Sequence, residues 1–263
     1  MNRRHLTFTC EGRTLCATLD SASAAGSTGL LLVSGGNEIR AGAWGGQARL
    51  SARLAAEGVP VFRYDRRGVG ESEGENHSFR GSAPDIAAAL AAFRAAAPHL
   101  RRVVAFGNCD AASALALFAA DLPVDAMVLA NPWTVEQNDG PTAHAPEALR
   151  RRYLSRLSDP AALLRLLTGK VNFGKLLRGL KASAGKVAAS PLATDMAAQL
   201  ARFGGPVTIL LATGDRVAQV FAAQWPAGDA RVQRHASASH SFSEADAQDW
   251  LFERLMEATA VRH

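Results

Sequence analysis

The chain has 263 residues, of which 48% are hydrophobic and 20% are charged, and its formal net charge is +5. This length suffices for one large domain with a sizeable core. No apolar run reaches the roughly 18–20 residues of a membrane-spanning helix, and the opening "MNRRHLTFTCEGRTL" lacks the apolar region of a secretory signal. The three cysteines are an odd number, which argues against a disulfide framework and predicts a reducing, cytoplasmic location.

The positive charge is concentrated in one part of the chain. Residues 147–186 contain ten Lys and Arg against two acidic residues, a net charge of +8, so the remainder carries −3. Because the basic character is regional, the high isoelectric point does not predict nucleic-acid binding by the protein as a whole.

Short apolar runs alternate with longer helical patterns along the chain. The runs predict strands at 5–10, 14–20, 29–35, 59–65, 102–107, 126–132, 207–213 and 231–236. Helical spacing predicts helices at 47–57, 82–97, 110–120 and 244–258, the last one beginning after Ser243. Such alternation is typical of an α/β fold with a mostly parallel eight-stranded sheet and helices on both faces. The tight "EGRT" connection predicts that the first two strands form an antiparallel edge. In that hairpin Cys10 and Cys16 either face each other or, the favoured interpretation, are two half-buried thiols.

The alternation breaks once, over about 70 residues that precede "PVTILLAT". This leucine-rich and basic stretch predicts a helical lid inserted at about 134–200 within a single domain, 1–263. Its basic face suits an acyl chain with an anionic head group, an acidic substrate or an anionic membrane surface. A solvated cationic face around a leucine core is an equally good interpretation.

Three residues that can form a catalytic triad follow three predicted strands. Cys109 lies in "GNCDA", which matches the G-x-S-x-G nucleophile elbow with cysteine for serine and alanine for the last glycine. Asp215 follows "TILLAT" and His240 follows "RVQRHASAS". Because ligands bind beyond the carboxyl ends of parallel strands, these side chains are expected to meet there. In this order they predict a thiol nucleophile, a carboxylate that orients the histidine, and a histidine that moves protons.

The same end of the sheet predicts an oxyanion hole. One donor is the backbone N–H of Asp110, and the second is the N–H of Gly36 or Asn37 in the double-glycine loop "SGGN". Asp110 itself either begins the helix or takes part in catalysis, with the first role favoured. His235 is expected to be structural.

No cofactor and no metal site are predicted. "GVGESEG" at 68–74 resembles a dinucleotide fingerprint, but its third glycine comes one residue late and no helix begins at the loop.

Several motifs together resemble one known family. These are "YDRRGVGESEG", "SGGNEIRAG", "GNCDAAS", "NPW" followed by "RRRYLSRL", and "SASHSFS". They are similar to the exosortase A system-associated hydrolase 1 group, α/β hydrolases encoded with bacterial exopolysaccharide and protein-sorting loci, over roughly residues 30–258. The resemblance implies triad roles for Cys109, Asp215 and His240. It also marks Arg40, which either binds a substrate carboxylate or braces its loop.

Together these features predict a hydrolase that acts on a small ester or thioester through a cysteinyl acyl-enzyme. Two alternatives stay open within enzymes: acyl transfer to an acceptor other than water, and dienelactone-type hydrolysis. A non-catalytic partner protein that keeps the fold is the alternative from another class.

Overall fold

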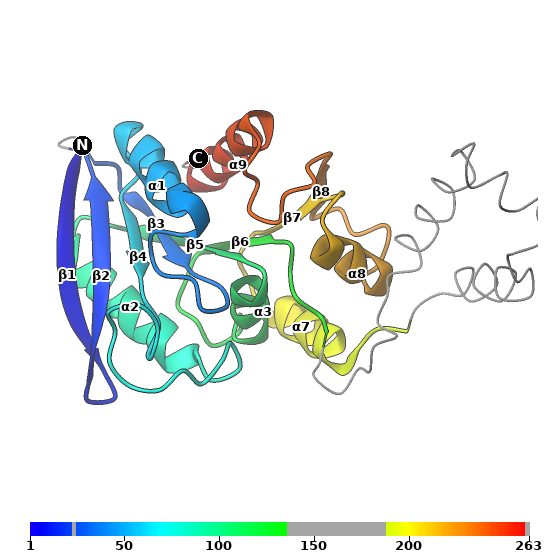
Figure 1. Cartoon of the computed structure of the whole chain (residues 1–263), viewed down its shortest axis with the longest axis horizontal. Coiled ribbons are helices and arrows are strands. Elements are labelled where there is room, and N and C mark those ends of the chain that lie inside the picture. The colour runs from blue at the N-terminus through cyan, green and yellow to red at the C-terminus, as the bar shows by residue number, and fades with distance from the viewer. Residues whose placement is uncertain (23–24, 136–187, 261–263) are drawn as a thin grey trace, which may run out of the picture.

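A mixed sheet of eight strands organises the computed structural model, which describes residues 1–22, 25–135 and 188–260. The strands follow the order β1-β2-β4-β3-β5-β6-β7-β8 (Figure 1). Their bounds are β1 Asn2–Cys10, β2 Arg13–Ser21, β3 Thr28–Val33, β4 Val61–Tyr64, β5 Arg102–Asn108, β6 Ala126–Ala130, β7 Val207–Ala212 and β8 Val232–His235. From β4 to β8 each neighbouring pair is parallel, which confirms the predicted α/β fold.

The antiparallel edge is also confirmed. Glu11 and Gly12 both have positive φ, 47° and 75°, as a tight two-residue hairpin turn requires. The register pairs Cys10 with Arg13 and Cys16 with Thr7, so the two cysteines do not face each other. Both are free thiols.

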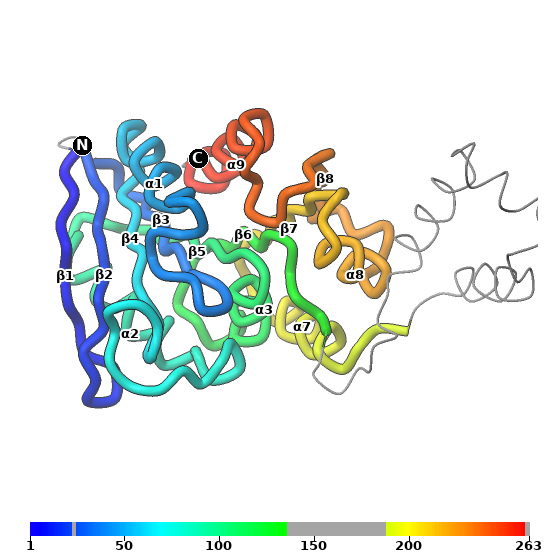
Figure 2. Tube along the Cα trace, in the orientation of Figure 1, coloured from blue at the N-terminus to red at the C-terminus, as the bar shows by residue number. Residues whose placement is uncertain are grey.

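The helices cover both faces of the sheet because alternate side chains of each strand point to opposite sides. Their bounds are α1 Gly46–Ala56, α2 Ala83–Ala96, α3 Asp110–Leu117, α7 Pro191–Arg202, α8 Arg216–Gln224 and α9 Ala245–Thr259, with a short 3₁₀ turn η1 at Ala43–Gly45. In β3, Leu30 and Leu32 belong to the core under α1 and α9, whereas Leu31 belongs to the core under α2, α3, α7 and α8. Figure 2 shows the chain passing from β3 through α1 and back to β4.

Two predicted boundaries change. The last helix begins at Ala245 with Glu244 as its N-cap, because the Ser243 hydroxyl bonds the Ser239 hydroxyl instead of capping the helix. The end of the predicted insertion contains α7, whose Leu192 and Met196 are buried in the main core. This helix therefore covers the sheet as part of the core. Residues 136–187 of the predicted lid, with the whole basic segment 147–186, lie outside the described residues.

Candidate active site

Cys109 lies in a sharp turn between β5 and α3. Its φ is 61° and its ψ is −128°, a conformation that is strained for any residue other than glycine. A Cβ atom on Gly107 would come within 2.8 Å of the Ala111 backbone, so this position requires glycine. Ala111 is fully buried and stands where the strict motif has its last glycine. The predicted strand–turn–helix elbow is therefore present, with a half-buried thiol at its tip.

Asp215 and His240 meet as the sequence predicts. The Nδ1 atom of His240 lies 3.0 Å from Oδ2 of Asp215. The same carboxylate oxygen accepts a hydrogen bond from the Ala218 N–H, because Asp215 is the N-cap of α8. Asp215 is buried, whereas the His240 side chain is 38% exposed. The carboxylate is thus fixed by its helix and can in turn orient the imidazole ring.

The pKa of His240 is raised from 6.5 to about 10. The largest cause is the hydrogen bond with Asp215 and the next is the interaction with the Cys109 side chain, although burial acts in the opposite direction. At neutral pH the imidazole is therefore protonated. A histidine that can exchange protons is the partner that a thiol nucleophile needs.

The double-glycine loop approaches the start of α3, but its contact differs from the expected one. The Gly36 N–H donates to Oδ1 of Asp110 at 2.6 Å. A Cβ atom on Gly35 would lie 2.6 Å from that same oxygen, so glycine is needed for the approach. The predicted second oxyanion donor, Gly36, is thus already bound by a side chain. Asp110 is the first residue of α3, as predicted, and its carboxylate additionally holds this loop.

Arg66 lies on the other side of the loop. Its guanidinium donates to the Gly36 carbonyl, and Nη2 lies 3.8 Å from Oδ2 of Asp110. The side chain is 3% exposed, and Nη1 has no hydrogen-bond partner among the described residues. Asn37, the other candidate donor, is exposed, and its side-chain Oδ1 accepts from Asn76 at 2.8 Å.

Arg40 makes contacts within the protein that fit a role in bracing its loop. Its guanidinium pairs with Asp65 and Glu71, and its Nε donates to the Thr18 hydroxyl at 3.2 Å. These contacts tie the loop after β3 to β2 and to the loop after β4. These contacts favour the bracing interpretation, and the substrate-binding role of Arg40 stays a prediction.

Sequence reasoning missed Asn131. It directly follows the buried strand β6, has a φ of 41° and is fully buried. Its amide contacts the backbone of His240. A polar residue at the end of a buried strand was the available signal. His235 instead packs against Trp250 with ring centroids 5.1 Å apart, in line with the expected structural role.

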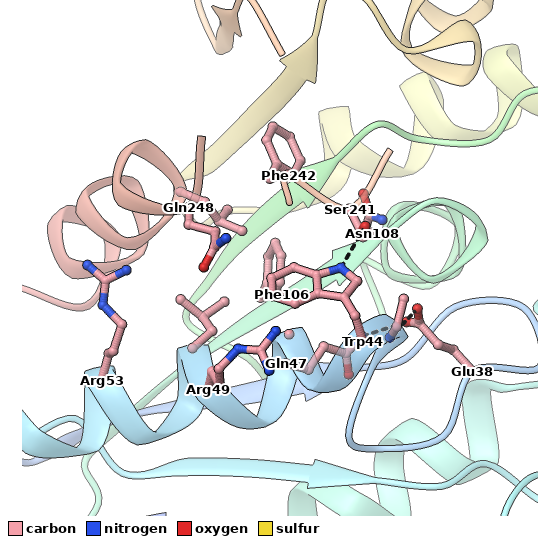
Figure 3. A pocket seen from close by; sticks show the side chains of 14 residues that line it. Glu38, Trp44, Gln47, Arg49, Arg53, Phe106, Asn108, Ser241, Phe242 and Gln248 are labelled. Carbon is pink, nitrogen blue, oxygen red and sulfur yellow. Dashed lines mark hydrogen bonds between the residues drawn. The ribbon is translucent and has the colours of Figure 1, made fainter. Parts of the chain in front are cut away.

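A pocket opens between α1 and α9 (Figure 3). Its lining includes Asn108 and Ser241, the chain neighbours of Cys109 and His240, but none of the three triad residues. Phe106 and Phe242 form part of its apolar wall, and the Trp44 indole N–H donates to the Ser241 hydroxyl at 3.2 Å across it. Arg49 stacks on Trp44, with its guanidinium carbon 4.2 Å from the ring centroid. The pocket therefore combines apolar walls with a positive charge.

Among the described residues, no group of three or more His, Cys, Asp and Glu side chains could hold a metal ion. Within those same ranges no helix is both long enough and apolar enough to cross a membrane.

Several solved structures share this fold. An esterase from Pyrococcus furiosus superposes with a TM-score of 0.58 at 13% identity, over 98% of this chain and 92% of the esterase chain. The thioesterase domain from the curacin biosynthetic pathway gives 0.57 at 12% identity, over 97% of this chain and 100% of the domain. A putative hydrolase from Agrobacterium vitis gives 0.61 at 16% identity, over 98% and 99% of the two chains. At these identities the likeness shows the fold alone.

Curated protein sequences gave no match. The sequence profile of the alpha/beta hydrolase family matches residues 30–254, which is most of the chain. The chain therefore belongs to the alpha/beta hydrolase family.

Proposed function

We propose that the protein hydrolyses an ester or thioester of a small acyl substrate, with Cys109 as nucleophile, His240 as acid and base, and Asp215 as the group that orients His240. The observation that carries this proposal is the 3.0 Å contact between Nδ1 of His240 and Oδ2 of Asp215. The strained elbow holds Cys109, whose side chain contributes to the raised pKa of His240. A cysteine that only fills space in the core requires neither a strained elbow nor a neighbouring histidine.

The chemistry proceeds in two steps. The Cys109 sulfur attacks the carbonyl carbon, and the new C–S bond forms a tetrahedral oxyanion next to the Asp110 N–H at the start of α3. The C–O or C–S bond to the leaving group then breaks, and the leaving group takes a proton from His240. Water attacks the acyl carbon while His240 takes one of its protons. The C–S bond to Cys109 then breaks, His240 returns the proton to the sulfur, and the carboxylic acid is released.

Esters and thioesters rank above peptides as substrates. A thiolate attacks an activated acyl group readily, whereas an amide leaving group needs stronger protonation. The apolar walls of the pocket between α1 and α9 favour an acyl or alkoxy group with a hydrophobic part, and the nearby Arg49 favours an anionic end. Acyl transfer and dienelactone-type hydrolysis use the same groups and are separated by the acceptor that releases the acyl-enzyme.

The resemblance to the exosortase A system-associated hydrolases supports a wider proposal. We place the protein in the cytoplasm, acting in a bacterial exopolysaccharide or protein-sorting system. The basic segment 147–186 is then available to contact an acidic substrate or an anionic membrane surface. No direct role for nucleic acid follows from this regional charge.

Mass spectrometry of the intact and digested protein tests the central proposal. After incubation with a panel of acyl thioesters and esters, we expect an acyl mass increment on the Cys109 peptide, which also identifies the preferred acyl class. The Cys16→Ser variant should label equally. Label on Cys10 or Cys16 alone, or no turnover of any ester or thioester, would favour the non-catalytic partner protein instead.

A further inference from the structure

Asn131 lies at the centre of the edge where the catalytic residues gather. It directly follows β6, which stands between β5 and β7 in the sheet. The side chain is fully buried and the backbone is left-handed, with a φ of 41°. Burial of an amide is unfavourable unless its hydrogen bonds are satisfied, so this side chain is expected to have a partner for each donor and acceptor.

The amide of Asn131 joins three separate segments. Its Oδ1 accepts from the Ala212 N–H at 2.9 Å, and its Nδ2 donates to the His240 carbonyl at 3.0 Å and to Oδ1 of Asn108 at 3.2 Å. Both N–H groups and the carbonyl oxygen of the side chain are therefore used. The backbone N–H of Asn131 also donates to the Leu210 carbonyl, which fixes the residue to β7.

Each of these three partners lies close to a member of the proposed triad along the chain. Asn108 immediately precedes Cys109, Ala212 comes three residues before Asp215, and the third partner is His240 itself. Asn108 adds a second amide donor to the same His240 carbonyl, at 3.1 Å. Two side-chain amides thus hold the backbone of His240, which lies beyond the end of β8.

We propose that Asn131 is a positioning residue that sets His240 in register with Cys109 and Asp215. This inference rests on the proposed function. The imidazole can meet both partners only if its backbone is placed correctly, and a displacement of about 1 Å in an active site can lower the rate about a hundredfold. Among the described residues, Asn131 is the side chain that links the His240 backbone both to Asn108 at the end of β5 and to Ala212 at the end of β7.

The residue type is explained by the same contacts. A leucine of similar size would leave the Ala212 N–H and the His240 carbonyl without this partner. An aspartate would still accept from Ala212 but would place a carboxylate oxygen against two acceptors, the His240 carbonyl and Oδ1 of Asn108. Asparagine alone among residues of this shape offers one acceptor and two donors here.

The experiment measures the rate at which iodoacetamide alkylates Cys109, together with kcat and KM for a short-chain thioester. For Asn131→Asp at pH 8 we expect both kcat and the alkylation rate to fall roughly tenfold or more, with KM changed less than about twofold. As the pH is lowered to 5.5 the introduced carboxyl group protonates and can donate again. The ratio of variant to unmodified alkylation rate should therefore rise, which lost stability alone does not produce.

Ser82→Ala is the matched control, because Ser82 is also buried and its hydroxyl donates to the Phe79 carbonyl at 2.7 Å, away from the triad. It should lower the melting temperature without changing the alkylation rate. An Asn131→Asp protein that is destabilised like the control, with an unchanged alkylation rate, overturns the inference. If Asn131→Asp does not fold, kcat and the alkylation rate are measured for Asn108→Asp instead. This variant removes the second amide donor to the His240 carbonyl, so both rates should fall.

The two proposals fail in different ways. Full turnover by Cys109→Ala contradicts the assignment of Cys109 as nucleophile, whatever rates the Asn131 variants show. Loss of turnover in Cys109→Ala together with unchanged kinetics of the Asn131 and Asn108 variants contradicts only the positioning role.

Discussion

Cys109 and Cys10 are the same residue type in opposite surroundings. Cys10 ends β1, is 4% exposed, and its thiol donates to Oδ1 of Asp85 at 3.4 Å. Burial, and next the hydrogen bond with Asp85, raise the pKa of Cys10 to about 11. Cys109 is half-buried at the start of a helix, and its neighbour is His240.

A carboxylate lies near each of these cysteines, but it is used differently. Asp85 accepts from the Cys10 thiol and also pairs with Arg67, so it keeps that thiol protonated. Asp215 is separated from Cys109 by the His240 ring, and Asp110 turns its carboxylate to Gly36. The two cysteines therefore differ in whether a histidine stands between the thiol and the carboxylate, which is the arrangement that the proposed thiol nucleophile requires.

The largest difference between the two cysteines is expected when each is replaced by alanine in turn. Cys109→Ala should lower kcat for a thioester by about a thousandfold or more, because Cys109 is the group that forms the proposed acyl-enzyme. Cys10→Ala should keep kcat within about twofold and lose stability instead, since it removes a buried side chain. Steady-state kinetics and thermal unfolding measure both. Equal turnover by Cys109→Ala and the unmodified protein would contradict the nucleophile assignment.

Alkylation compares the two thiols within one protein. A thiol with a pKa of about 11 is thiolate in roughly one molecule in ten thousand at pH 7, so Cys10 should be nearly inert. We expect iodoacetamide to modify Cys109 at least about a hundredfold faster, as measured by peptide mass spectrometry over time. Asp85→Asn should speed modification of Cys10 and leave Cys109 unchanged. Comparable rates at both cysteines would remove the distinction between the two regions.

Much of this comparison was available from the sequence. The strand ends after "RVVAF" and "TILLAT" predicted Cys109 and Asp215 at one edge of the sheet, because parallel strands place their carboxyl ends together. His240 followed from chain order. The partners of Asp110, Arg40 and Asn131 were out of reach, since each depends on which side-chain rotamer reaches a segment distant in sequence. The packing of α7 in the core was missed because a leucine-rich helix has the same pattern in a lid and in a core.

Asp110 offers a smaller test of the Cys109 region. Asp110→Ala should free the Gly36 N–H, while Arg66 still holds the Gly36 carbonyl and the Glu38 N–H still donates to Gly35. The freed donor can then bind an oxyanion, so kcat/KM should rise by roughly threefold. Asp85→Ala, the matched change beside Cys10, should leave kcat/KM unaltered. A tenfold or larger loss in Asp110→Ala would mean instead that the carboxylate is needed to place the loop.

The smallest expected effect is a separation of two pH windows in stability. The pKa of His240 is raised from 6.5 to about 10 in the folded protein, so its contribution is complete below about pH 6.5 and falls as the pH rises toward 10. The pKa of Cys10 is raised from 9.0 to about 11, so its contribution is complete below about pH 9 and falls toward pH 11.

Urea unfolding of the unmodified protein, His240→Gln and Cys10→Ser at a series of pH values measures these windows. The difference in unfolding free energy between the unmodified protein and His240→Gln should shrink between pH 7 and pH 10, by about 1 kcal/mol or less because the His240 side chain is 38% exposed. The difference from Cys10→Ser should stay constant to about pH 9. Asp215→Asn should move the first window to lower pH, because the hydrogen bond that His240 donates to Asp215 is the largest cause of the raised pKa of His240. If both differences changed over the same pH range, the histidine would not be what distinguishes the surroundings of Cys109 from those of Cys10.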